Sequence, residues 1–237
     1  MTQKLDRTPL CAAILQSNYI PWKGYFDLIH DVDLFIFYDD VQYTTRDWRH
    51  RNKLMTQLGP QWLTIPAGQD RNRLIYEVEI QDQSWKREHR STIEQHYRDA
   101  PFFSESQPLL DFLYDNAITN LSDYNQRAIR HLSDILGINT QFMDSRSLAV
   151  NGRKTERLIA ILEKVGATKY LSGPSARDYI DEPLFVEAGI ELVYKEYPAY
   201  PVYRQCFTPF SPFVTVLDLL FNVGPEAAPD YIWGSRE

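Results

Sequence analysis

Two short apolar runs, separated by a segment with helical spacing, constrain the fold of this chain more than any other feature. Residues 12–15 form the first run and residues 34–38 the second, while residues 24–31 between them place apolar side chains on one side of a helix. Two parallel strands in one sheet need a crossover connection of this kind, usually a helix. The second run is apolar without interruption, so we expect a strand that is covered on both faces.

The same alternation of strands and helices continues to the end of the chain. We expect further strands at residues 62–67, 74–80, 141–143, 169–171 and 191–197. We expect further helices at residues 84–97, 105–119, 122–136, 154–165, 184–188 and 214–221, with Ser84 and Ser122 as N-caps and Gly137 as a left-handed terminus. This order predicts an α/β fold in a single domain of residues 1–237: a mainly parallel sheet flanked by helices, with a helical insertion or lid around residues 84–137.

The net charge and the cysteine and histidine content argue against several classes of partner and cofactor. The chain carries a formal net charge of -7, which argues against sequence-independent binding to DNA or RNA, because such binding depends on neutralising phosphates. Two distant cysteines and five scattered histidines give neither a disulfide framework nor a metal-ligand spacing, so we expect no metal site. The first ten residues lack the apolar core of a signal peptide, and no stretch approaches the ~18 apolar residues of a membrane span. We therefore expect a cytoplasmic protein with a small-molecule substrate.

Polar and aromatic residues crowd the positions where the predicted strands end. The segments 16–24, 39–42 and 172–175 each follow a strand, and the carboxyl ends of parallel strands meet at one edge of a sheet. Lysine and arginine there could hold phosphate or carboxylate, and tryptophan and tyrosine could stack on a base or a sugar. The candidate binding residues are Gln16, Asn18, Tyr19, Trp22, Lys23, Gly24, Tyr25, Gln42, Arg46, Trp48, Arg51, Asn52, Lys53, Ser172 and Gly173.

Two residues are candidates for proton transfer. Neighbours on a strand point to opposite faces, so of the pair at a strand end we expect Asp40 to face the crevice and Asp39 to cap the next element. His89 lies in a predicted helix, where a neutral imidazole could act as a general base; a histidine on the helix surface is the alternative. Asp218 lies in an apolar helix and needs a buried partner, which we expect from the loop 200–206. The residues identify no cofactor.

Six segments follow one another along the chain: QSNYIPWKGYFDLI, DLFIFYDDVQYTTRDWRHRNK, WLTIP, SWKREHRSTIEQHY, YLSGPSARDYI and PFVTVLDLLFNVG. In this order they resemble the WbqC-like family of bacterial proteins, and they extend over most of the chain. Ser17 stands where the family has proline, and His50 replaces the usual residue before the Arg-Asn pair. Both departures lie beside the candidate site and could mark a different substrate.

The resemblance implies a transferase of bacterial surface-polysaccharide (O-antigen) biosynthesis, which transfers a glycyl or other aminoacyl group to an amino sugar. For that reaction, His89 is the first candidate to accept the amine proton and Asp40 is the second. Arg51, Asn52 or the backbone at Gly173 would stabilise the developing oxyanion. The donor would be an activated amino acid. Among nucleic acids, only a charged tRNA is a candidate partner, because it could supply the aminoacyl group.

Two other functions stay open at this point. A nucleotidyltransferase-like enzyme would act on a nucleotide or a sugar nucleotide, with Lys23 and the following helix N-terminus on the phosphates. In that case Arg51 and Lys53 would hold the β and γ groups. A non-catalytic protein would instead bind a sugar nucleotide without turnover.

Overall fold

The computed structural model describes residues 9–234, and the expectation about a signal peptide falls largely on residues outside that range. The chain divides into two compact units. The sheet unit comprises residues up to 15, 28–38 and 140–196, and the hairpin unit comprises residues 16–27, 39–139 and 197 onward. A single domain over residues 1–237 stays a prediction, and the two units are described separately.

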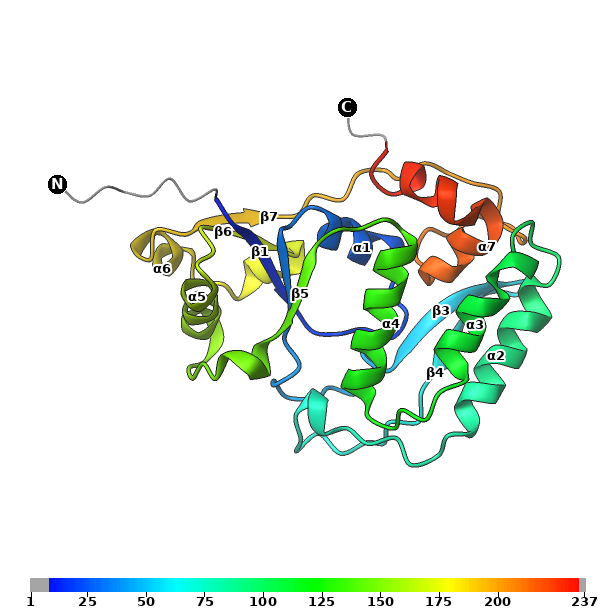
Figure 1. Cartoon of the computed structure of the whole chain (residues 1–237), viewed down its shortest axis with the longest axis horizontal. Helices are drawn as coiled ribbons and strands as arrows, with labels where there is room; N and C mark the ends of the chain where they lie inside the picture. The colour runs from blue at the N-terminus through cyan, green and yellow to red at the C-terminus, as the bar shows by residue number, and fades with distance from the viewer. Residues whose placement is uncertain (1–8, 235–237) are drawn as a thin grey trace. The chain divides into compact units, whose positions relative to one another are not determined.

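The sheet unit contains a five-stranded sheet in which every neighbouring pair is parallel (Figure 1). The strand order is β5-β2-β1-β6-β7, so the first two strands of the chain are neighbours, with Ala12 opposite Leu34 and Leu15 opposite Phe37. This confirms the α/β fold with a mainly parallel sheet. The strands are β1 (Cys11–Leu15), β2 (Leu34–Phe37), β5 (Gln141–Asp144), β6 (Lys169–Ser172) and β7 (Glu191–Tyr194).

Apolar side chains cover both faces of this sheet. All four residues of β2 are buried: Ile36 faces a cluster with Leu158 and Phe185, and Phe37 stacks on Phe142 with ring centroids 5.6 Å apart. Burial of this kind contributes about 25 cal/mol for each Å² of apolar surface removed from water. The helices of the unit are α5 (Lys154–Val165) and α6 (Glu182–Glu187), with short 3₁₀ turns at Ser145–Leu148 and Pro174–Asp178. Helix α1 (Lys23–His30) begins in the hairpin unit and ends in the sheet unit.

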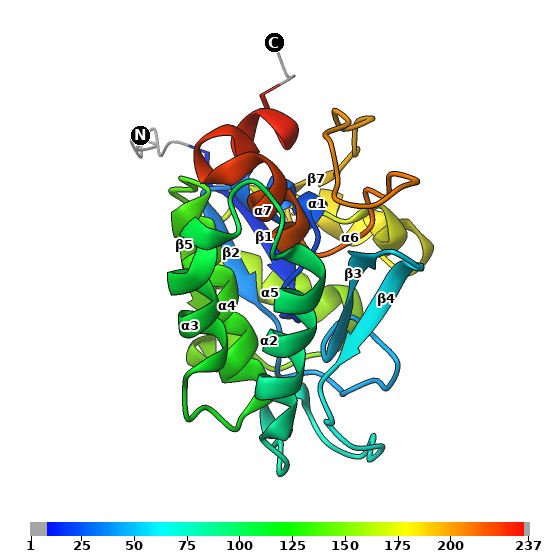
Figure 2. The same ribbon diagram turned by 90° about the vertical axis from the view of Figure 1, so that its right-hand side faces the viewer.

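The hairpin unit combines a two-stranded antiparallel hairpin with the helical insertion expected around residues 84–137. Figure 2 shows β3 beside β4, and α2 beside α3. Within residues 9–234, no helix combines the length and apolar character needed to cross a membrane. The elements are β3 (Arg51–Thr56), β4 (Gly59–Thr64), α2 (Ser84–Tyr97), α3 (Gln107–Tyr114), α4 (Leu121–Ile135) and α7 (Val216–Ala227), with 3₁₀ turns at Ile75–Glu77, Ser104–Ser106 and Ala228–Tyr231.

The structure corrects the local predictions at two places in the hairpin unit. Residues 74–80 alternate like a strand, but Ile75–Glu77 form a 3₁₀ turn. The backbone N–H groups of Ile75 and Tyr76 bond the carbonyls of Val41 and Asp39 instead of a neighbouring strand. Residues 51–56 were not expected to be a strand, yet they pair with residues 59–64. The sequence Arg-Asn-Lys-Leu-Met-Thr lacks the apolar alternation that predicts a strand.

The predicted helix caps also need correction. The side chain of Asn120, not Ser122, caps α4 by accepting a hydrogen bond from the backbone N–H of Asp123 at 3.1 Å. Ser84 is the first residue of α2 and follows the N-cap residue Gln83. Gly137 does adopt the expected left-handed conformation, with φ +70°.

Candidate active site

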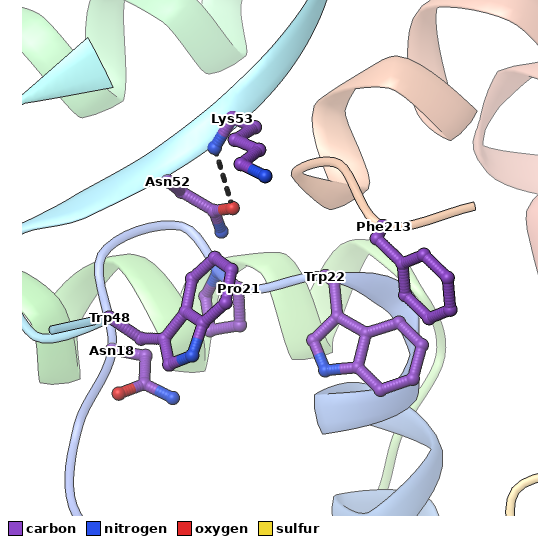
Figure 3. Close-up of a pocket in the computed structure, with 7 residues that line it drawn as sticks. All are labelled: Asn18, Pro21, Trp22, Trp48, Asn52, Lys53 and Phe213. Carbon is purple, nitrogen blue, oxygen red and sulfur yellow. Dashed lines mark hydrogen bonds between the residues drawn. The ribbon is translucent and has the colours of Figure 1, made fainter. Parts of the chain in front are cut away.

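An open cavity of about 460 Å³ in the hairpin unit gathers several of the predicted binding residues. Its lining is largely apolar, and the few polar groups are amides and one ammonium, which is the usual composition of a small-molecule site. Figure 3 shows the indole rings of Trp22 and Trp48 on either side of Pro21, with Phe213 beyond Trp22. The lining residues are Asn18, Pro21, Trp22, Trp48, Asn52, Lys53 and Phe213.

Aromatic packing and one glycine fix the position of Trp22. Its ring contacts the rings of Tyr197 and Phe213, with centroids 5.3 and 5.7 Å away. The ring also lies directly against the backbone of Gly24: a Cβ at that position would lie 2.3 Å from the indole. Gly24 therefore belongs to the site as the residue that makes room for Trp22, because any side chain there would displace the ring.

Strand β3 holds the two loops that bear the tryptophans. The Asn52 side-chain amide donates to the carbonyls of Tyr19 at 3.2 Å and Ile20 at 2.7 Å, and its oxygen accepts from the backbone N–H of Lys53 at 2.7 Å. Ile20 has φ +36°, a conformation that a β-branched residue adopts at a cost. With both amide hydrogens engaged, Asn52 orients the loop before Trp22.

A second strained residue is held in the same way. The Arg51 guanidinium donates to the carbonyl of Arg46, an exposed residue with φ +58° in the segment that leads to Trp48. The backbone N–H of Tyr19 donates to the carbonyl of Trp48 at 2.9 Å and joins the two loops directly. Side chains of one strand thus stabilise both walls of the cavity.

The predicted general base His89 lies in a buried network that does not line the cavity. Its Nδ1 accepts from or donates to the Tyr19 hydroxyl at 2.8 Å, and the same hydroxyl contacts that of Tyr114 at 2.9 Å. Burial lowers the pKa of His89 to about 4, and a hydrogen bond with the backbone of Thr64 opposes that shift. The imidazole is therefore neutral at pH 7, and its role in proton transfer stays a prediction.

The two aspartates that follow β2 differ in burial. Asp39 is fully buried and accepts from the backbone N–H of Ser17 at 2.8 Å, from the Ser122 hydroxyl at 2.5 Å and from the Gln126 amide at 3.3 Å. Burial raises the pKa of Asp39, and these hydrogen bonds act in the opposite direction. Asp40 is half-buried and does not line the cavity. Its role as a base stays a prediction.

Lys23, which was expected to hold phosphates, is 2% exposed. Its ammonium group donates to the carbonyl of Tyr231 at 3.1 Å and lies 4.7 Å from the centre of the Tyr200 ring. Burial lowers the pKa of Lys23 to about 8, and the charge of Asp218 opposes the shift. These contacts direct the ammonium into the packing around Tyr200.

Two of the remaining predicted binding residues donate to backbone carbonyls. The Tyr25 hydroxyl donates to the carbonyl of Gln16 at 2.9 Å, and the Gln42 amide donates to the carbonyl of Arg71 at 3.2 Å. Ser172 and Gly173 belong to the sheet unit, where Ser172 is the last residue of β6 and Gly173 precedes a 3₁₀ turn. None of these residues lines the cavity.

The buried partner expected for Asp218 is present. Tyr203 and Gln205, in the loop 200–206, donate to its carboxylate at 2.6 and 2.8 Å, and Tyr97 donates at 2.6 Å. This confirms the predicted bond to that loop, and α7 is thereby tied to the segment that precedes Phe213.

Two lining residues were not among the candidates. Pro21 lies in the segment QSNYIPWKGYFDLI directly before the candidate Trp22, so the sequence around it already indicated the site. Phe213 lies in a proline-rich segment that shows no strand or helix pattern. It reaches the site because the backbone N–H of Thr215 donates to the carbonyl of Lys53 at 2.8 Å. A contact between segments so far apart in the sequence is not predicted by any local pattern.

The fold and the cavity define an α/β protein with an open cavity that is lined mainly by aromatic and apolar side chains. The chain belongs to the WbqC-like protein family, whose model matches residues 16–229. It is 46% identical over 229 residues to the uncharacterized protein Rv1507c of Mycobacterium tuberculosis (strain ATCC 25618 / H37Rv), a similarity that covers 95% of this chain and 98% of the relative. No solved structure matches the chain.

Proposed function

We propose that this protein is a transferase of bacterial surface-polysaccharide biosynthesis that holds a sugar unit in the aromatic cavity. The observation that carries the proposal is the lining itself: Trp22, Trp48 and Phe213 present ring surfaces beside the amide of Asn18. Apolar ring faces pack on the C–H faces of a sugar or on a base, while amides bond hydroxyl groups. The side chains of Trp48 and Phe213 are 44% and 64% exposed, so both are open to a ligand.

The proposed reaction is transfer of a glycyl or other aminoacyl group to the amine of an amino sugar. An amide bond forms between the donor carbonyl carbon and the sugar nitrogen, and the bond from that carbon to the donor's oxygen or sulfur leaving group breaks. The amine loses a proton to a base, and the leaving group takes up a proton. Asp40 and His89 are the proposed bases, acting on a donor bound beside the cavity.

Calorimetric titration of UDP- and GDP-linked amino sugars tests the binding step. We expect Trp48→Ala to weaken binding by about tenfold or more, because stacking on one aromatic ring contributes roughly 1–3 kcal/mol. Leu58→Ala is the matched control, since Leu58 is 99% exposed at the turn between β3 and β4 and does not line the cavity. Unchanged affinity in both Trp48→Ala and Trp22→Ala would contradict the proposal.

A non-catalytic sugar-nucleotide-binding protein is the second candidate, and one observation favours it: neither Asp40 nor His89 lines the cavity. Mass spectrometry of an amino sugar incubated with protein and activated glycine separates the two functions. A product heavier by one glycyl group supports the transferase, and binding without product supports the alternative. Full turnover in both Asp40→Asn and His89→Gln would show that neither residue accepts the amine proton.

A further inference from the structure

Two cations emerge from the same face of β3 next to the aromatic cavity. Arg51 and Lys53 are two residues apart on the strand, so their side chains leave it on one side. The Arg51 guanidinium carbon lies 4.1 Å, and the Lys53 nitrogen 4.7 Å, from the centre of the Trp62 ring. Lys53 also lines the cavity, and Trp62 contacts Trp48 with ring centroids 5.2 Å apart. The charged surface is therefore continuous with the aromatic one.

Neither cation has an acidic partner in the described part of the chain. Among residues 9–234, no carboxylate forms an ion pair with Arg51 or Lys53, whereas Arg49 in the same segment pairs with Asp47 at 2.8 Å. The chain has 32 acidic and 25 basic side chains, so acids are not scarce. Two like charges on one strand face repel each other, and this arrangement lowers stability unless an anion lies near them.

The neighbouring histidine experiences the same positive charge. The pKa of His50 is lowered to about 4, first by burial and then by the charge of Arg51, while Asp47 opposes the shift. Trp62 alone does not account for the pair, because one indole compensates only part of the charge of two cations. A ligand that carries negative charge would compensate the positive charges of both Arg51 and Lys53.

We propose that Arg51 and Lys53 form an anion subsite for the diphosphate of a nucleoside diphosphate, whose attached sugar occupies the aromatic cavity. This inference rests on the proposed function and names its substrate class. The planar guanidinium can bond two phosphate oxygens at once, and the Lys53 ammonium bridges the subsite and the cavity. Figure 3 shows the Lys53 side chain extending from β3 toward the aromatic residues.

The test uses calorimetric titration of the full chain with UDP, GDP, uridine, inorganic pyrophosphate and farnesyl diphosphate. Lys53→Met removes one charge, and Arg51→Met removes one charge together with the bond to the Arg46 carbonyl. Both variants keep an apolar stem to pack on Trp62. Arg87→Met is the matched control, because Arg87 is exposed on α2 and the same charge is lost. We expect about tenfold weaker binding of UDP or GDP, and of pyrophosphate, in the two β3 variants, with the control unchanged. Thermal denaturation of each variant separates lost binding from lost stability.

Each possible result decides the inference. Equal affinity for UDP, GDP and pyrophosphate in wild type, Arg51→Met and Lys53→Met overturns it, as does the absence of binding at millimolar concentration. Tighter binding of farnesyl diphosphate than of UDP or GDP overturns the nucleoside assignment. If diphosphates depend on the cations but Trp48→Ala and Trp22→Ala both leave sugar-nucleotide binding unchanged, the anion subsite stands and the proposed function fails. If Trp48→Ala alone weakens binding, the sugar cavity stands and the anion subsite fails.

Discussion

Gly24 shows how one missing side chain can shape a binding site. The Trp22 ring occupies the space that a Cβ would fill, so the conformation of the aromatic wall depends on the absence of that atom. The contact lies at the first turn of α1, where the chain leaves the loop that bears Asn18 and Pro21.

Gly24→Ala is therefore expected to weaken sugar-nucleotide binding by tenfold or more and to destabilise the fold by about 1–3 kcal/mol, because the ring or the helix must move. Calorimetric titration and urea denaturation measure the two effects. Gly173→Ala is the matched control, since a Cβ there meets nothing within 4 Å and no left-handed φ is involved. A Gly24→Ala protein with wild-type affinity would show that the Trp22 position does not matter for binding.

At the scale of elements, the cavity depends on a short strand more than on the helices. Strand β3 holds the loop before Trp22 through Asn52, holds the segment before Trp48 through Arg51, and pairs with Thr215 next to Phe213. A strand that bonds three separate segments positions their side chains more precisely than the loops alone could.

Asn52→Ala is expected to cost about 1–3 kcal/mol of stability, because it leaves the carbonyls of Tyr19 and Ile20 without donors. Relaxation of the strained Ile20 backbone would then weaken ligand binding by about tenfold, because the Asn52 amide hydrogens that hold this backbone are lost. Gln61→Ala on β4 is the control, since Gln61 is exposed on the same hairpin. Unchanged stability and affinity in Asn52→Ala would contradict the positioning role.

The same elements explain what the sequence could and could not predict. The parallel sheet was predictable because β1 and β2 are local apolar runs and the later strands alternate with helices. Strand β3 was not, because its residues are mostly polar and its pairing depends on the turn with β4. Five cavity residues, including Trp22 and Trp48, were predicted from strong local motifs. Phe213 was missed because backbone bonds between distant segments, such as the bond from Thr215 to Lys53, bring it to the site.

At the scale of the whole molecule, buried histidines make the fold sensitive to acid. His89 and His50 both have a pKa lowered to about 4, chiefly by burial, against an ordinary value of 6.5. The unfolded chain therefore binds more protons than the folded chain between those values. Stability is present in full above pH 6.5 and falls as the pH decreases toward 4. Asp39 and Asp218, whose pKa burial raises, act in the opposite direction.

His89→Gln is expected to reduce the loss of unfolding free energy between pH 7 and pH 5, because it removes one histidine whose pKa the fold lowers. Urea denaturation at the two pH values measures that loss in wild type and variant. His30→Gln provides the control, since the His30 side chain is 39% exposed. An identical pH dependence in wild type and His89→Gln would show that His89 does not contribute to acid sensitivity.

The chain passes between the two compact units after residues 15, 27, 38, 139 and 196. Neither unit is a continuous stretch, so the sheet lacks its last strand until Tyr194 has been made, and the cavity lacks one wall until Phe213 has. During synthesis on the ribosome, an N-terminal fragment of the chain cannot fold completely into either unit, because each unit also needs later residues. The sheet unit cannot complete its folding before residue 196 has emerged, and the hairpin unit needs residues beyond 197, so the nascent chain exposes apolar segments for most of its translation.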